Sequence, residues 1–506
     1  MDVKNIDLIS LFERALNDAP ETTFEQVGKV IQVGDGICRV YGLNKVLYNE
    51  LVTFEGGNQG IVLELDQESV AIFLLSDTIP ITEMELVKRT GHVLKVPVGP
   101  ALLGRVVNAI GHPIDSLGAL DTDQFKPVEA PIPGVTAREP ISESLETGIM
   151  AVDALVPIGK GQRELIIGNR GSGKTSLALD AIAHQKGQNV RCVYVSIGQR
   201  QANLARIVRF LQEKDALSYT TIVVADSSEA VLNQYLAPYA GCTIAEYFRD
   251  AGLDTLIVYD DLSNHAIAFR EMSLLLRRAP GREAYPGDVF YLHSRLLERA
   301  GRLLNGGSLT ALPIVQIQGD DLTAYIPTNL ISITDGQILL DSTLFNQGVR
   351  PAVNAELSVS RVASAAQTKA MRKMVKTLKL DIAQYKELID FAQFGTELDE
   401  VSRQRLARGA RVVELLKQNE HETFSFVDQV LMLFLLQRNY LDHLEIAQVR
   451  PFATQFVGYV KLLSTPIYTQ IFEERDLTEA TEAELAIAAH DFDILFRASG
   501  GTIKTD

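Results

Sequence analysis

The sequence predicts three successive folds in one chain: an N-terminal small β-barrel, a central α/β domain with a mostly parallel sheet, and a C-terminal α-helical domain. Short β-like runs separated by Gly and Asn turns fill residues 24–88, strand and helix patterns alternate over 89–367, and the strand signal disappears over 368–506. The chain has 506 residues, of which 46% are hydrophobic, and this is enough for two or three separately cored domains.

The N-terminal part is predicted to be a helical arm followed by the barrel. Residues 1–23 include apolar side chains from Ile6 to Leu16 at helical spacing, which is the pattern of a short amphipathic helix. After it, the run VIQV (30–33) leads into Gly-Asp-Gly, and LVTF (51–54) leads into Gly-Gly-Asn. Closely spaced strands with such turns are typical of a small all-β sandwich or barrel.

The central and C-terminal parts differ in their hydrophobic periodicity. Candidate buried strands in the central part are the runs at 165–167, 193–197, 222–225, 256–259 and 314–317, and helical patterns such as 176–185 and 273–278 lie between them. This alternation predicts a parallel sheet covered by helices, with ligands beyond the carboxyl ends of the strands. The C-terminal helical patterns cover 369–391, 402–418, 425–440 and 481–497.

Charge and cysteine content exclude several classes of function. The formal net charge is −16, and we expect no nucleic-acid partner because phosphate contacts need clustered Lys and Arg. Cys38, Cys192 and Cys242 are far apart and show no CxxC spacing, so neither a disulfide framework nor a zinc site is expected. The apolar runs are too short to span a bilayer, and the N-terminus lacks the pattern of a signal peptide.

The strongest motif lies between the first central strand and the helix after it. It fits GxxxxGK[ST] in full and consists of Gly168, Asn169, Arg170, Gly171, Ser172, Gly173, Lys174 and Thr175. The glycines allow backbone N–H groups to converge on phosphate oxygens, and the helix start adds its positive dipole end. We expect Lys174 to reach the β- and γ-phosphates of ATP, or the β-phosphate of ADP, and the Thr175 hydroxyl to be a ligand of Mg²⁺.

Two further strand ends bear on the chemistry of this site. The run 256–259, expected to be a neighbouring strand, ends in Asp260 and Asp261; we expect Asp260 to act on Mg²⁺ through water, whereas Asp261 could orient the loop. Hydrolysis also needs a group that polarises the attacking water. At the end of strand 193–197 the chain has Gln199, which has no charge to accept a proton. This pattern indicates slow turnover, although some NTPases orient water with a Gln.

Five stretches carry a more specific resemblance. They are PIGKGQRELIIG (157–168), YDDLS (259–263), SLLLRRAPGREAYPGD (273–288), IPTNLISITDGQ (326–337) and LSVSRVASAAQ (357–367). Together they resemble the alpha subunits of F-type (rotary) ATP synthases, over nearly the whole chain and in order. The resemblance implies a RecA-like P-loop domain and a hexamer that alternates with beta subunits around a central gamma shaft. In that hexamer the alpha site is non-catalytic.

The resemblance also implies roles for particular residues. The family's arginine finger falls on Arg361, which would reach the γ-phosphate in a beta site; without the resemblance, Arg361 would be taken for a surface ion pair. A planar, always-charged guanidinium suits a finger because it can neutralise charge spread over the equatorial oxygens of the transition state. Ser358 matches a position needed for activity, and Phe345, Pro351 and Gln418 match positions of the adenine pocket.

The same resemblance implies the surroundings of the chain. The N-terminal arm would dock a delta-type peripheral stalk subunit, and the loop at 280–288 would face the gamma shaft. The complex would be a peripheral membrane assembly on the cytoplasmic face of the bacterial inner membrane, coupled to a membrane sector that translocates ions.

The chain departs from the family's pattern at its own nucleotide site, as a divergent bacterial-type member would. The family's loop usually reads GDRQTGKT, whereas this chain has Asn169, Gly171 and Ser172. Glu420 stands where an adenine-contacting Gln is common. A carboxylate cannot donate a hydrogen bond as an amide does, so we expect the affinity or the base preference of this site to differ.

Three alternatives share parts of this pattern. A self-catalytic hexameric ATPase of the type III export kind would need a carboxylate at position 199, where this chain has Gln199. An RNA-translocating hexamer resembling Rho would need an RNA-reading surface, which the acidic balance and the helical C-terminal domain disfavour. A purely structural nucleotide-binding subunit would make no use of Arg361.

Overall fold

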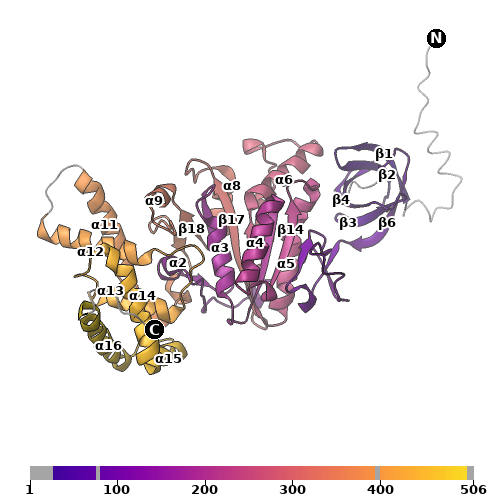
Figure 1. Ribbon diagram of the computed structural model, residues 1–506. Helices are drawn as coiled ribbons and strands as arrows, with labels where there is room; N and C mark the ends of the chain where they lie inside the picture. The colour runs from indigo at the N-terminus through magenta and orange to yellow at the C-terminus, as the bar shows by residue number, and fades with distance from the viewer. Residues whose placement is uncertain (1–26, 76–79, 394–398, 499–506) are drawn as a thin grey trace, which may run out of the picture.

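The computed structural model describes residues 27–75, 80–393 and 399–498, and it has the three predicted parts. The barrel and the helical domain lie at opposite ends of the central α/β domain (Figure 1). The helical arm predicted within residues 1–23 lies outside the described residues. Among the helices that are described, none is long and apolar enough to cross a membrane.

The N-terminal part is a closed barrel with the strand order β1-β2-β5-β4-β3-β6. Its strands are β1 (Val27–Gly34), β2 (Ile37–Gly42), β3 (Glu50–Phe54), β4 (Gln59–Leu65), β5 (Ser69–Leu74) and β6 (Leu86–Val93). Alternate residues of β3 point inward, and Val52 and Phe54 join the barrel core. Closure leaves no free sheet edge. The last strand continues past the predicted boundary at residue 88.

The central sheet has nine strands, eight of them in the order β19-β18-β12-β17-β15-β13-β14-β8, with β16 paired to β17. Its strands are β8 (Val106–Asn108), β12 (Leu165–Asn169), β13 (Val190–Gln199), β14 (Thr220–Asp226), β15 (Asp254–Asp260), β16 (Gly301–Arg302), β17 (Ser308–Ile317), β18 (Gly336–Leu340) and β19 (Val359–Ser360). All pairings are parallel except those of β16 and β19. The five predicted strands are therefore confirmed, and so is their parallel arrangement.

The strand order corrects one expectation. β17 lies between β12 and β15, so the strand that ends in Asp260 is not the direct neighbour of the strand before the phosphate loop. β13, which ends in Gln199, lies one strand farther away. The pairing depends on contacts between segments far apart in the chain, such as Ile166 with Ile314 and Thr255 with Leu309, and the apolar runs themselves carry no information on strand order.

Helices cover both faces of this sheet (Figure 1). They are α2 (Met150–Leu155), α3 (Lys174–His184), α4 (Gln201–Glu213), α5 (Val231–Asp250), α6 (Leu262–Leu275), α7 (Val289–Leu297), α8 (Tyr325–Ile333) and α9 (Ser342–Asn346). Successive side chains of β13 point to opposite faces of the sheet. Tyr194 belongs to the apolar cluster on the α3 face, and Val193 and Val195 belong to the cluster on the α5 face. The helical pattern predicted at 273–278 overlaps α6 only over its last three residues, because α6 begins eleven residues earlier and ends at Leu275.

The remaining central elements are short. They are β7 (Lys95–Pro97), β9 (Phe125–Pro127), β10 (Ser144–Leu145), β11 (Ile158–Gly159) and the 3-10 helices η1 (Pro100–Leu102), η2 (Val135–Ala137), η3 (Leu217–Tyr219), η4 (Arg282–Ala284) and η5 (Ala363–Ala366).

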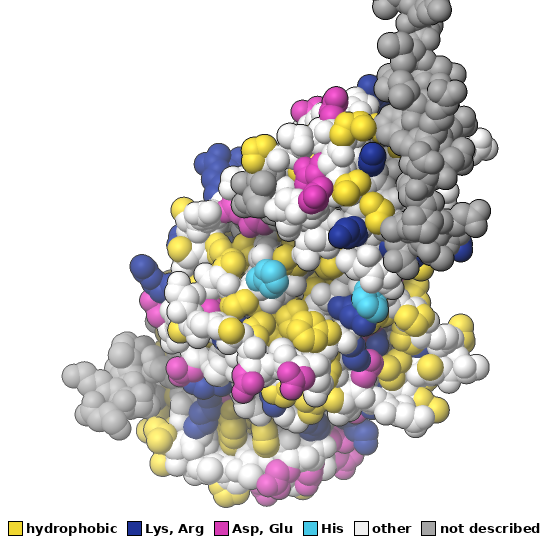
Figure 2. Space-filling model, turned by 90° about the vertical axis from the view of Figure 1, so that its right-hand side faces the viewer, with side chains coloured by type: hydrophobic (Ala, Val, Ile, Leu, Met, Phe, Trp, Pro, Cys, Tyr) yellow, Lys and Arg dark blue, Asp and Glu magenta, His cyan; other side chains and the backbone are white. Residues whose placement is uncertain are grey.

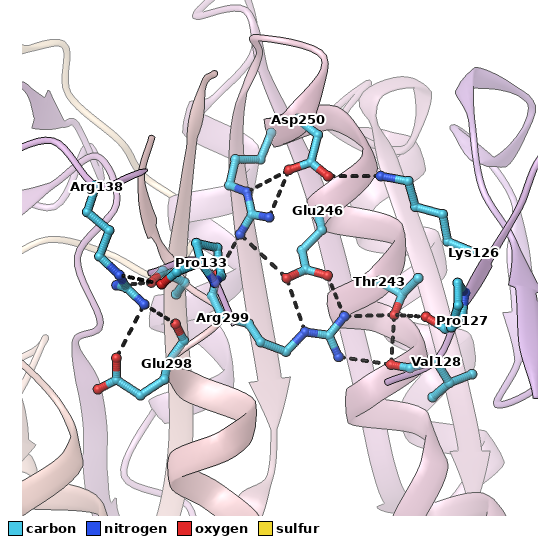
Figure 3. A network of polar contacts seen from close by, with 12 residues as sticks. Lys126, Pro127, Val128, Pro133, Arg138, Thr243, Glu246, Asp250, Glu298 and Arg299 are labelled. Atoms are coloured by element: carbon cyan, nitrogen blue, oxygen red, sulfur yellow. Dashed lines mark hydrogen bonds and ion pairs between the residues drawn. The ribbon is translucent and has the colours of Figure 1, made fainter. Parts of the chain in front are cut away.

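A buried ion pair fastens the segment after β9 to the helices behind the sheet (Figure 3). Arg299 and Glu246 are 1% and 4% exposed, and Nε and Nη2 of Arg299 each donate to one oxygen of the Glu246 carboxylate. Arg299 Nη1 also donates to the Val128 carbonyl at 2.9 Å, and Nη2 donates to Thr243 Oγ1 at 2.8 Å. The connection between the barrel and the sheet is thus held at a fixed point on α5.

Over its described residues, the C-terminal domain consists of helices joined by turns and irregular segments. It contains α10 (Lys369–Met374), α11 (Leu378–Gln393), α12 (Glu400–Leu416), α13 (Phe426–Gln437), α14 (Ile446–Leu463), α15 (Thr465–Glu474) and α16 (Glu479–Ala498). The pattern predicted at 369–391 is two helices, α10 and α11. Every residue of α13 from Phe426 to Leu436 is buried, so this helix is the centre of the domain. One continuous apolar cluster joins it to the α3 face of the sheet.

Candidate functional site

The predicted phosphate loop joins β12 to α3. Gly171 and Gly173 have φ angles of 79° and 95°, in the left-handed region that favours glycine. Gly168 is needed for a different reason, since a Cβ atom there would lie 2.7 Å from Ser172 Oγ and 2.8 Å from the Leu340 carbonyl. α3 begins at Lys174, so its first N–H groups face the loop. The loop therefore has the backbone shape that a phosphate-binding turn requires.

Lys174 and Asn169 hold this loop from two sides. Lys174 is 7% exposed, and its ammonium donates to the carbonyls of Gly168 at 2.9 Å and Asn169 at 2.6 Å. Burial lowers the pKa of Lys174, an effect that Asp261 and Asp260 oppose. The Asn169 amide donates to Asp320 at 2.8 Å and to Ser342 Oγ at 2.7 Å. Asn169 thus ties the loop to the ends of β17 and β18, whereas the exposed Arg170 faces the cavity.

The candidate magnesium ligands are in contact. Thr175 Oγ1 donates to Asp260 Oδ2 at 2.8 Å, and the buried Tyr194 hydroxyl donates to the same oxygen at 2.6 Å. Asp261 instead caps α6 by accepting from the Asn264 N–H. Burial and the Asp260 charge raise the pKa of Asp261 to about 7.

This donor set fits a magnesium ion that is also bound by phosphate. Within the described ranges, no group of three or more His, Cys, Asp or Glu residues could hold a metal ion. Mg²⁺ keeps several waters and is usually bound by one or two protein oxygens together with substrate phosphates. The Thr175 hydroxyl and the Asp260 carboxylate suit that kind of coordination, because they already lie within hydrogen-bond distance of each other.

Gln199 faces the same region from the end of β13. Its Nε2 donates to the Asp260 carbonyl at 3.2 Å, and its Oε1 accepts from Asn203 at 3.3 Å. It lines a cavity of about 790 Å³ together with Lys174 and Thr175. Sequence reasoning did not find Tyr194, which donates to Asp260, nor several polar residues that line the cavity and belong to no motif: Arg200, Asn203, Arg206, Asn264 and Gln316.

A second cavity of about 710 Å³ adjoins the first, and the two share Gly171, Gly173, Ser176 and Glu420. The three residues expected around the base, Phe345, Pro351 and Gln418, all line it. The guanidinium of Arg350 lies over the Phe345 ring, 4.4 Å from its centre, and forms part of the same wall. The phosphate loop and this second cavity together form a site of the size that nucleotides occupy.

Arg361 lies at the end of the strands opposite to the phosphate loop, and Ser358 lies beside β18. β19 pairs with the first residues of β18, next to the start of β12, whereas the phosphate loop follows the end of β12. Arg361 is exposed; its backbone N–H donates to the Asp335 carbonyl at 2.8 Å, and its side chain makes no hydrogen bond or ion pair with the residues described. Ser358 is 1% exposed, and its hydroxyl accepts from the Leu339 N–H at 2.9 Å, which fixes β18.

The three parts of the chain match known domains. Residues 24–91 match the beta-barrel domain and residues 148–360 the nucleotide-binding domain of the ATP synthase alpha/beta family, and residues 367–492 match the C-terminal domain of the alpha/beta chains. The chain is also 49% identical, over 479 residues, to a protein named ATP synthase subunit alpha from Caldanaerobacter subterraneus subsp. tengcongensis; the match covers 94% of this chain and 95% of that protein. The chain therefore belongs to the alpha subunits of F-type rotary ATP synthases, which are parts of an enzyme complex that makes or hydrolyses ATP.

Proposed function

We propose that this chain is a non-catalytic alpha subunit that binds Mg-ATP or Mg-ADP and supplies Arg361 in trans to the catalytic site of a beta subunit. In this role it supports rotary ATP synthesis or hydrolysis coupled to ion transport. The observation that carries the proposal is the state of Arg361. It is an exposed guanidinium with no side-chain partner among the residues described, and it lies at the amino ends of β12 and β18, whereas the chain's own phosphate loop follows the carboxyl end of β12.

The chain's own site supports binding without turnover. Gln199 occupies the end of β13, and its amide is bonded to the Asp260 carbonyl and to Asn203. The two carboxylates beside the loop have other tasks, since Asp260 accepts from Thr175 and Asp261 caps α6. No carboxylate at this strand end is left to polarise water, which disfavours a self-catalytic export-type ATPase. Mg²⁺, when bound, would draw charge from the phosphates, and Lys174 and the loop amides would orient them.

The proposed partners are a beta subunit in an alternating hexamer, a central gamma shaft and a delta-type stalk subunit at the N-terminal arm. The arm itself lies outside the described residues. The proposed location is a peripheral membrane complex on the cytoplasmic face of the bacterial inner membrane, next to an ion-translocating sector. On the face at the barrel end, Figure 2 shows Lys and Arg side chains in small groups among acidic and apolar ones, which does not favour a nucleic-acid partner.

The test is turnover of a reconstituted alpha–beta–gamma complex that carries Arg361→Ala in this chain. A finger of this kind contributes about 10³ to 10⁵ in rate, so we expect ATP hydrolysis to fall by about a thousandfold or more while nucleotide binding to this chain is retained. Arg403→Ala is the matched control, because Arg403 is exposed on α12 and, among the residues described, forms an ion pair only with Glu400. Unchanged turnover in the Arg361 variant would leave the purely structural subunit as the explanation.

A second arm of the same experiment addresses the export-type alternative. The isolated chain is expected to bind Mg-ATP and to hydrolyse it negligibly. Rapid hydrolysis by the isolated chain that Lys174→Ala abolishes would establish a self-catalytic ATPase instead.

A further inference from the structure

A network of hydrogen bonds holds the backbone on which Arg361 is carried. Ser360, the residue before it, pairs with Gly336 of β18, and the Arg361 N–H donates to the Asp335 carbonyl at 2.8 Å. The Asp335 carboxylate is bound in turn by Arg163, whose Nε and Nη2 donate to its two oxygens at 3.0 Å and 2.8 Å. The backbone of Arg361 is therefore tied on this side to the segment that leads into β12.

The Ser360 hydroxyl holds the other side of this backbone. Its Oγ donates to the Pro157 carbonyl at 2.8 Å, and it accepts from the Ala363 N–H at 3.2 Å and from Gln162 Nε2 at 3.1 Å. These bonds reach both sides of Arg361 in the chain, since Ser360 precedes it and Ala363 follows it. The Ser360 hydroxyl thus fixes the bend that contains Arg361.

The side chain of Gln162 sets the direction of the bonds that meet at Ser360. Gln162 is 0% exposed, and its Oε1 accepts from the Gly159 N–H at 2.7 Å. Its Nε2 donates one proton to Ser360 and the other to Glu164 Oε2, at 2.6 Å. Glu164 is also 0% exposed. Without this acceptor, an amide proton of Gln162 would be buried and unpaired, and the amide would no longer be held toward Ser360.

We propose that Gln162 and Glu164 are positioning residues for Arg361, because they hold Ser360 and with it the bend that presents the guanidinium to a beta site. The inference rests on the proposed function of Arg361 as a finger in trans. Among the residues described, no side chain bonds the Arg361 guanidinium, so its placement within this chain comes from its backbone. That placement matters, since a displacement of about 1 Å can cost about a hundredfold in rate.

The ionisation of Glu164 suits this role. Burial raises the pKa of Glu164 well above its usual range, although the charges of Lys379 and Arg361 oppose the shift. A carboxyl group that keeps its proton still accepts from the Gln162 amide, but it provides no counterion for Arg361. The charge of Arg361 therefore remains available for a phosphate outside this chain.

The test is ATP hydrolysis by a reconstituted alpha–beta–gamma complex in which this chain carries Glu164→Met or Glu164→Gln. Methionine is similar in size and has no acceptor for the Gln162 amide, whereas glutamine keeps one. We expect Glu164→Met to lower kcat by about tenfold to a hundredfold with little change in KM, because only an interaction made in the transition state is misplaced. Glu164→Gln should restore most of the rate. An unchanged kcat in Glu164→Met, or an equal loss in both variants, would overturn the inference.

A cycle with Arg361→Ala separates positioning from a general loss of structure. Gln162→Met should lower kcat when Arg361 is present and should lower it no further when Arg361→Ala has already removed the finger. Ser360→Ala, which removes only a hydroxyl group, should show the same pattern if Gln162→Met fails to fold. Losses that add to that of Arg361→Ala would show a structural effect and overturn the inference.

Gln185→Met is the matched control for the cycle. Gln185 is 2% exposed, and its Nε2 donates to the carbonyls of Glu146 and Ala181, each at 2.8 Å. It is thus a buried amide with two donated bonds, like Gln162, but it lies at the end of α3. We expect Gln185→Met to leave kcat unchanged in both backgrounds. A loss equal to that of Gln162→Met would contradict a specific role for Gln162.

The proposed function fails in a distinguishable way. If Arg361→Ala leaves hydrolysis unchanged, Arg361 is not a finger and the inference falls with it. If Arg361→Ala lowers hydrolysis as expected while the Glu164 and Gln162 variants do not, the finger stands and only its positioning is wrongly assigned.

Discussion

Burial sets the ionisation of single residues on both sides of the sheet. Beside the phosphate loop it lowers the pKa of Lys174 and raises that of Asp261 to about 7. Behind the sheet, His265 and His293 are 0% exposed, with ring centres 5.4 Å apart. Burial lowers the pKa of His265 to about 3 and that of His293 well below its usual range. Both rings are therefore neutral in the folded chain at physiological pH.

The histidine pair makes the central domain less stable in acid. Unfolded histidines take up protons below about pH 6.5, whereas the folded pair stays neutral until the pH is much lower, so the free energy of unfolding falls as the pH falls through this window. For His265 alone, with its pKa of about 3, the loss at pH 5 is about 2 kcal/mol. Tyr235 and Tyr239 pack against the His265 ring and Arg295 adds positive charge nearby, which also opposes protonation.

His293→Leu should relieve part of this cost. Neither ring nitrogen of His293 has a hydrogen-bond partner among the residues described, so an apolar side chain of similar size loses no polar contact. We expect the midpoint of thermal unfolding to rise at pH 5 by more than it rises at pH 8. His490→Gln, on the exposed side of α16, is the control and should change neither. An equal decrease at both pH values would contradict the prediction.

At the scale of elements, the pairing of β18 and β19 brings Arg361 near the buried carboxyl group of Glu164. Glu164, just before β12, is 0% exposed; its Oε2 accepts from Gln162 at 2.6 Å, and its Oε1 has no partner among the residues described. Burial raises the pKa of Glu164 well above its usual range, and Asp335 adds to this, whereas Lys379 and Arg361 oppose it. A Cβ atom at position 336 would lie 2.4 Å from Glu164 Oε2, so β18 can lie this close to Glu164 only with glycine at that position.

Glu164→Gln should stabilise the central domain at neutral and alkaline pH. A carboxyl group with a raised folded pKa keeps its proton while the unfolded chain loses it above about pH 4.5, so the free energy of unfolding falls as the pH rises from there. Glutamine keeps the acceptor for Gln162 and has no charge to bury. We expect thermal unfolding to show a higher midpoint at pH 8 and little change at pH 4.

The control for this prediction is Glu213→Gln, since Glu213 is exposed near the end of α4. It should have the same midpoint as the wild-type chain at both pH values. A lower midpoint for Glu164→Gln at pH 8 would mean that the carboxylate is ionised and paired in the folded state.

At the scale of the molecule, different kinds of contact join the two end domains to the central domain. The apolar cluster around α13 continues onto the α3 face, so the helical domain and the sheet share one core. The barrel side is instead fastened through the segment after β9, where Arg299 binds Glu246, Thr243 and the Val128 carbonyl (Figure 3). At the surface of the same network, Lys126 pairs with Asp250 at 2.8 Å with both side chains about 40% exposed.

Glu246→Gln should therefore be costly, because it leaves the Arg299 charge buried without its counterion. Breaking a buried pair from one side costs about 3 to 5 kcal/mol, and we expect a matching loss in the free energy of unfolding measured with urea. Lys126→Ala removes an exposed pair of the same network and should cost about 1 kcal/mol or less. Equal effects of the two variants would contradict a role for Arg299 and Glu246 as the main fastening.

The helical domain shows what hydrophobic periodicity can and cannot predict. The pattern at 369–391 predicts helix correctly, but the turn between α10 and α11 follows from packing, since Met374 and Leu378 are buried at the junction. Ser358 and Gln418 were predicted from resemblance alone, and both are buried and bonded to backbone groups. Nothing in the sequence distinguishes a buried Ser or Gln of this kind from one that faces a ligand.

The sequence by itself determined the three folds and the phosphate loop. Continuous apolar runs specify buried strands, and GxxxxGK[ST] specifies a loop shape through its glycines, because both are local properties of the chain. Only the tertiary structure decided that β17 separates β12 from β15, that Arg361 lies at the end of the strands opposite to the loop, and that the Gln418 amide is bonded to backbone groups. These depend on contacts between residues far apart in the chain, which no local pattern encodes.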